Sequence, residues 1–90
     1  MINKTRNKMM IKIKLVVPKL LMYDQNIKGH TQVLNLEYNN PVTVDQVLKD
    51  KKINMHFLGF MVLNGNKNVN KNFLIEESCE LKLFLLMAGG

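Results

Sequence analysis

Few residues of this chain are of a type that carries out chemistry, and most of them occur alone. His30 and His56 have no second histidine, cysteine or carboxylate at the spacing of metal ligands, so we expect surface histidines and no metal site. Cys79 is the single cysteine, and alternation puts it on the same side as Leu81, which favours a core thiol over a reactive one. The sequence also lacks a phosphate-binding glycine loop and a nucleophile elbow. The body of the chain therefore predicts no active site.

The remaining candidate is the end of the sequence, where an apolar segment runs into Ala88-Gly89-Gly90. Two glycines make an arm without Cβ atoms, and such an arm can carry a terminal carboxylate into a narrow channel. This arrangement suits a chain end on which another enzyme acts. The alternative interpretation is a frayed terminus that carries two glycines by chance.

The composition favours one small folded domain. The chain has 90 residues, 47% of them hydrophobic, and no apolar run approaches the roughly 18 to 20 residues that span a bilayer. Its start lacks the apolar stretch and the cleavage site of a secretory signal, and one cysteine fits a reducing compartment. We therefore expect a cytoplasmic protein with no membrane contact.

The net charge of +6 is concentrated near the start of the chain. Residues 1–19 contain six basic residues and no acidic one, whereas residues 20–90 are neutral overall. We expect residues 1–8 to form a flexible basic arm, which would favour an acidic protein surface or nucleic acid. The predicted strands do not interleave aromatic and basic residues for base stacking, so nucleic acid is not an expected partner.

Alternating apolar and polar residues predict four strands, with the second antiparallel to the first. They cover residues 10–17, 31–38, 57–65 and 80–87. Residues 18–30 form a long connection whose conformation the sequence does not specify.

A helix is predicted between the second and third strands. Thr43 and Gln46 have the spacing of a capping box, and an apolar stripe follows them, so we expect two to three helical turns. Asn64-Gly65 predicts a hairpin turn, followed by a short exposed strand near Val69 and by a loop or single helical turn over "FLIEES". This order predicts an α+β fold in which a mixed sheet of four to five strands packs on one main helix.

The predicted strands also leave apolar side chains facing solvent, and exposed patches of this kind mark interaction sites. The residues that would form the patch are Val16, Phe60, Val62, Lys82, Phe84 and Leu86. The alternative is that the connection formed by residues 18–30 covers them.

Taken together, residues 10–90 resemble the ubiquitin-like β-grasp sulfur carriers of thiamin and molybdopterin biosynthesis. The matching segments are "TVDQVL" at the helix start, "MVLNGN" at the third strand and its turn, and "ELKLFLLMAGG" at the last strand and tail. The chain departs from the family where "EESCE" replaces the usual Asp-Gly-Asp turn before the last strand. The resemblance implies a β-grasp domain over residues 9–87 and an extended tail over residues 88–90.

The resemblance also implies a function and a set of partners. The carboxylate of Gly90, with Gly89 as spacer, would be adenylated by a ubiquitin-activating-like adenylyltransferase and converted into a thiocarboxylate. The thiocarboxylate would donate sulfur to a synthase of thiamin or of molybdopterin or tungstopterin biosynthesis, namely thiazole synthase or the large subunit of molybdopterin synthase. The docking residues would be Phe60, Val62, Lys82, Phe84, Leu86, Met87 and Ala88.

In this interpretation the chain is not an enzyme but a protein co-substrate. It binds no cofactor stably, and its partner uses the ATP. The alternative is a ubiquitin-like modifier that becomes linked through Gly90 to lysines of target proteins.

Overall fold

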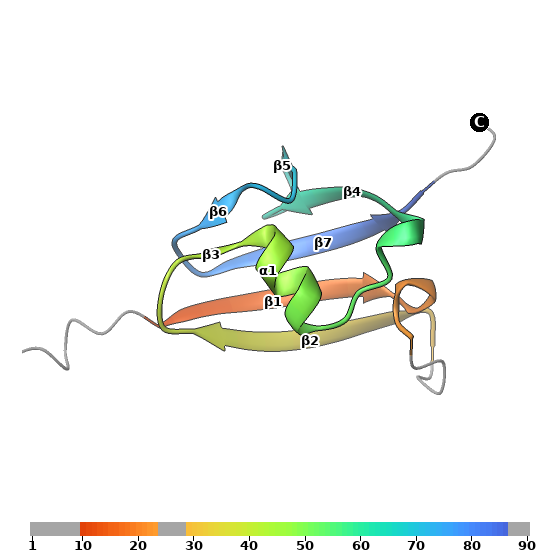
Figure 1. Cartoon of the computed structure of the whole chain (residues 1–90), viewed down its shortest axis with the longest axis horizontal. Helices are drawn as coiled ribbons and strands as arrows, with labels where there is room; N and C mark the ends of the chain where they lie inside the picture. The colour runs from red at the N-terminus through yellow and green to blue at the C-terminus, as the bar shows by residue number, and fades with distance from the viewer. Residues whose placement is uncertain (1–9, 24–28, 87–90) are drawn as a thin grey trace, which may run out of the picture.

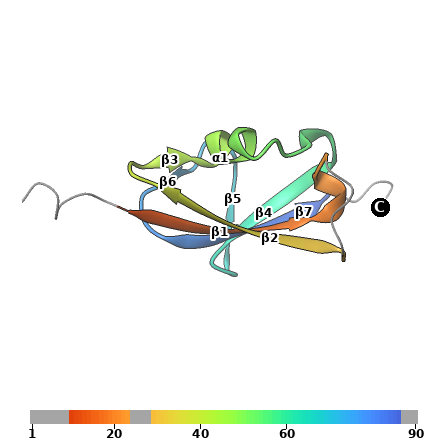
Figure 2. The same ribbon diagram turned by 90° about the horizontal axis from the view of Figure 1, so that it is seen from below.

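The structure is a computed structural model that describes residues 10–23 and 29–86. The predicted basic arm at 1–8 and the predicted tail at 88–90 lie outside these residues. The described part is a small α+β fold, in which the α-helix α1 (Val44–Asp50) crosses one face of a mixed sheet of five strands (Figures 1 and 2). No helix within the described ranges is long and apolar enough to cross a membrane.

The order of the five strands in the sheet is β2-β1-β7-β4-β5. Their bounds are Ile11–Pro18 for β1, Thr31–Tyr38 for β2, Leu58–Leu63 for β4, Lys67–Val69 for β5 and Cys79–Leu85 for β7. The central pair, β1 and β7, is parallel, and the other neighbours are antiparallel. The four strands that alternation predicts are confirmed, and so is the antiparallel pairing of the second strand with the first.

Alternation along the central strands builds the core. On β1 the side chains of Ile11, Ile13, Leu15 and Val17 are at most 1% exposed, whereas Lys12 and Lys14 between them are exposed. On β7, Leu81 and Leu83 are equally buried. One face of the sheet therefore carries the core, which α1 completes from above with Val44, Val47 and Leu48.

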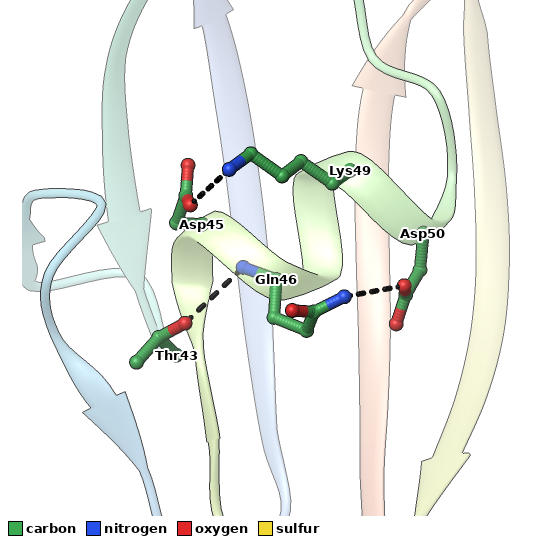
Figure 3. Close-up of polar contacts among 5 residues, drawn as sticks. All are labelled: Thr43, Asp45, Gln46, Lys49 and Asp50. Atoms are coloured by element: carbon green, nitrogen blue, oxygen red, sulfur yellow. Dashed lines mark hydrogen bonds and ion pairs between the residues drawn. The ribbon is translucent and has the colours of Figure 1, made fainter.

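The start of α1 is capped as predicted, but only on one side. The backbone N–H of Gln46 donates to Thr43 Oγ1 at 3.2 Å, whereas the Gln46 side chain donates to Asp50 Oδ1 at 2.7 Å (Figure 3). The reciprocal half of the predicted capping box is therefore wrong. The first helical amides, of Val44 and Asp45, donate to backbone carbonyls in the segment after β5.

Two short elements that the sequence did not predict lie over the same face. Strand β3 (Val42–Thr43) pairs with β6 (Leu74–Ile75), which replaces the loop or helical turn expected in "FLIEES". Ile75 is 2% exposed, so this pairing adds an apolar side chain to the core. A strand of two residues has no periodicity to detect.

The connection after β1 also belongs to the helix-side layer. It forms a 3-10 turn, η2 (Lys19–Leu21), whose Leu21 is fully buried in the core. A second 3-10 turn, η3 (Met55–Phe57), follows α1, and the Asn54 N–H just before it donates to the Leu21 carbonyl at 2.8 Å. Residues 18–23 therefore lie on the same side of the sheet as α1 (Figure 2) and do not cover its opposite face, while residues 24–28 lie outside the described part.

A side-chain hydrogen bond ties the end of β2 to the end of α1. Tyr38 Oη donates to Asp50 Oδ2 at 2.8 Å. The bonds from Tyr38 and then from Gln46 lower the pKa of Asp50. Burial, followed by the bond to Asp50, raises the pKa of Tyr38 from 10.0 to about 12.

We expect Tyr38→Phe to lower the free energy of unfolding at pH 7, because it removes this link. The contribution of Asp50 is present above its ordinary pKa and is lost as the pH falls through the lowered pKa of the folded state. The contribution of Tyr38 is complete below pH 10 and is lost as the pH rises towards about 12. Urea denaturation of both proteins across this range measures the difference, and a difference independent of pH would contradict the assignment.

Candidate functional site

The chain reaches its last described residue, Leu86, directly from the centre of the sheet. Strand β7 lies between β1 and β4 (Figure 1), so its backbone is bonded on both sides and its direction is fixed. Of the residues that the sequence proposes as reacting or docking groups, Met87, Ala88, Gly89 and Gly90 lie outside the described residues. The structure therefore defines the platform from which they continue.

A bulge in β4 shapes the end of β7. Leu58 is opposite Leu85 and Met61 is opposite Leu83, so Gly59 and Phe60 together face one residue, Phe84. A Cβ atom on Gly59 would lie 2.6 Å from the carbonyl oxygen of Leu85, which shows that glycine is what allows the two backbones to approach here.

The bulge brings two aromatic side chains together on the face of the sheet opposite α1, which we call the outer face. The rings of Phe60 and Phe84 stack with centroids 4.4 Å apart and an interplanar angle of 5°. The ammonium group of Lys82 lies 5.6 Å from the Phe84 ring centroid, within the range of a cation–π contact. Phe60 remains 48% exposed, so the stack lies open to solvent.

The aromatic stack continues across the sheet as a strip of small apolar side chains. Lys82 is opposite Val62 of β4 and Val16 of β1, and Val16 is in turn opposite Val33 of β2. We call this set the apolar band, and its members are Val16, Val33, Phe60, Val62 and Phe84. The sequence predicted all of them except Val33, which is 45% exposed and which alternation also places on the outer side of its strand.

The other end of the outer face is charged, with an ion pair and a further basic residue opposite an acidic one. Lys14 lies 3.8 Å from Glu80, and Lys12 is opposite Glu37 in the strand register. Exposed pairs of this kind contribute little to stability, but they leave this end hydrated and close to neutral. Lys82 differs, because its neighbours across both strands are valines. The outer face is thus an apolar band with one basic group in its middle.

The structure separates Leu86 from the predicted patch. Its side chain lines a groove of about 180 Å³ with Leu20, Phe57 and Leu85, at the end of the molecule where β7 finishes. Its backbone N–H donates to the Phe57 carbonyl at 2.7 Å. The sequence did not identify Leu20 or Phe57 as surface residues, since they belong to the 3-10 turns rather than to a periodic element.

The other candidate groups lie away from these surfaces or carry no activating neighbour. His30 and His56 are exposed, and no group of three metal-binding side chains occurs in the ranges that the structure covers. Cys79 is half-buried against the core, and burial, followed by the charge of Glu77, raises the pKa of its thiol. A raised pKa disfavours the reactive thiolate.

Comparison with known proteins found no matching family model, no similar curated protein and no similar solved structure.

We expect Gly59→Ala to lower the free energy of unfolding by roughly 1–3 kcal/mol, because the new methyl group meets backbone rather than a side chain that can move. Urea denaturation measures this. Gly65 provides the matched control, since it has a φ of 78° and open space around it. Gly65→Asn should be tolerated, because asparagine adopts positive φ readily, whereas Gly59→Asn should destabilise at least as much as Gly59→Ala. If both Gly59 variants were as stable as the wild type, the close approach of Gly59 to the Leu85 backbone would be contradicted.

Proposed function

We propose that this chain is a ubiquitin-like sulfur carrier with a β-grasp fold, and that the Gly90 carboxylate is its reacting group. The observation that supports the proposal most is the place of β7. This strand lies at the centre of the sheet, carries Lys82 and Phe84 on the outer face, and continues in sequence within a few residues to Gly89 and Gly90. A strand fixed on both sides and an exposed apolar surface therefore directly precede the two glycines in sequence.

The arrangement of the elements is compatible with the proposed fold. A mixed sheet with parallel central strands, crossed on one face by α1, is what the resemblance implies. The bare outer face then remains for a partner, because the described connection after β1 packs on the other side.

The chemistry proposed for Gly90 follows from the low reactivity of a carboxylate as an acyl donor. Attack of a carboxylate oxygen on the α-phosphorus of ATP forms an acyl-adenylate and releases pyrophosphate. A sulfur nucleophile then attacks the acyl carbon and displaces AMP. Hydrosulfide gives the thiocarboxylate directly, whereas a persulfide gives an acyl disulfide, whose S–S bond a thiol must reduce to release the thiocarboxylate. ATP and the sulfur donor are held by the adenylyltransferase, which positions them and stabilises the developing charge. The carrier supplies the acyl group and a docking surface.

The outer face supplies that docking surface. The apolar band offers area for burial, and Lys82 within it favours a partner that places a carboxylate among apolar side chains. The proposed partners are the adenylyltransferase and, after it, thiazole synthase or the large subunit of molybdopterin synthase, all in the cytoplasm.

We expect incubation with ATP, a sulfur donor and an adenylyltransferase of the same genome to exchange one oxygen for sulfur at the C-terminus. Intact-mass spectrometry measures the exchange and also shows whether the chain ends at Gly90. Deletion of Gly90 should abolish the exchange without changing the denaturation midpoint, since the buried residues of β7, Leu81 and Leu83, precede it by several positions. Absence of exchange with every such enzyme would contradict the proposal, and covalent conjugates that depend on Gly90 would favour the ubiquitin-like modifier instead.

We expect Phe60→Ser to raise the KM for adenylation about tenfold with little change in kcat, because it removes an exposed contact and not a reacting group. Pyrophosphate release measures both constants. Leu74→Ser is the matched control, since Leu74 is 45% exposed, close to the 48% of Phe60, but belongs to β6 on the other layer. The same KM for Phe60→Ser, Leu74→Ser and the wild type would exclude the outer face as a docking surface.

A further inference from the structure

Three large apolar side chains are exposed together in the groove at the end of β7. Leu20 is 61% exposed, Phe57 is 56% exposed and Leu86 is 57% exposed, and the three side chains line one depression together with Leu85. Large apolar side chains gathered in this way on a small domain are typical of a binding surface.

The walls of the groove are held in place by backbone contacts. The two 3-10 turns are joined through the hydrogen bond from Asn54 to Leu21 and through the bridge between Met22 and Ile53. The hydrogen bond from the Leu86 N–H to the Phe57 carbonyl fixes the third wall. The groove is therefore part of the folded body, and a partner would not have to order it on binding.

The length of chain beyond Leu86 limits how far Gly90 can lie from this groove. Four residues, Met87 to Gly90, follow Leu86 in the sequence. Even fully extended, four residues span at most about 14 Å. An enzyme that encloses the Gly90 carboxylate together with ATP must bring the mouth of its channel to within this distance of Leu86. Its rim therefore meets the side chains around the groove.

The lining of the groove indicates the chemistry of that rim. All four lining residues are leucine or phenylalanine, and no charged residue of the described ranges lines the groove. An apolar rim complements this surface.

We infer that the groove formed by Leu20, Phe57, Leu85 and Leu86 is a second docking surface, occupied by the apolar channel mouth of the adenylating enzyme while Gly90 is in its active site. This inference rests on the proposed function and adds to it a contact separate from the outer face. The outer face positions the body of the domain, and the groove aligns the exit of the tail with the channel.

The test compares adenylation of Leu20→Ser and Phe57→Ser with that of the wild type and of Leu74→Ser. Both groove residues are more than half exposed, so their variants should fold, which the denaturation midpoint checks. Pyrophosphate release with the adenylyltransferase that converts the wild type gives KM and kcat. We expect each groove variant to raise KM about tenfold with little change in kcat, and the Leu74 variant to match the wild type.

A synthetic peptide with the sequence "LFLLMAGG" provides a second comparison, because it carries the tail but lacks Leu20, Phe57 and the folded sheet that form the groove with Leu85 and Leu86. We expect it to be adenylated with a KM at least about a hundredfold higher than that of the whole domain, which reflects the loss of both docking surfaces. If the groove variants have the wild-type KM while the wild type is adenylated, the inference is wrong and the proposed function stands. If no enzyme adenylates the wild type, both are wrong.

Discussion

The parallel contact between β1 and β7 is the interaction on which the rest of the structure depends. In their register Ile13 is opposite Cys79 and Leu15 is opposite Leu81, and three of these side chains are at most 1% exposed. Parallel strands cannot be joined by a tight turn, so the chain between them has to cross over the sheet. Along that path it forms β2, α1 and the β4–β5 hairpin. Because α1 covers only one face, the other carries no further helix or strand within residues 10–23 and 29–86, and both proposed docking surfaces include residues of β7.

The sequence predicted those parts of the fold that repeat a local pattern. Alternation located the long strands, and Asn64-Gly65 located the hairpin, where both residues have the positive φ that such a turn needs. The elements it missed depend on partners distant in sequence. The pairing of β3 with β6 and the bulge at Gly59 are defined only once the neighbouring strand is in place. The side chain of Gln46 is a different case, because the partner that replaces the expected one, Asp50, is only four residues away.

Of the two candidate docking surfaces, one could be predicted from the sequence and the other could not. The outer face follows from strand periodicity, so five of its residues could be named from the sequence, and the structure adds the stack of Phe60 on Phe84 and the partner position Val33. The groove could not be named, because Leu20 and Phe57 lie in 3-10 turns where exposure depends on how the two turns meet. The alternation of apolar and polar residues can therefore predict a surface that lies on strands. It cannot predict a surface whose residues come from the connections between them.

The two edges of the sheet differ in a way that affects how the protein behaves at high concentration. Strand β5 is a three-residue edge that begins with a lysine, whereas β2 is eight residues long, pairs with β1 without a bulge and contains neither lysine nor proline. Such an edge can pair with the same edge of another copy. What opposes this is the net charge of +6, which every copy carries and which salt screens. Salt therefore weakens the repulsion that keeps these edges apart, and that repulsion comes largely from residues at the start of the sequence.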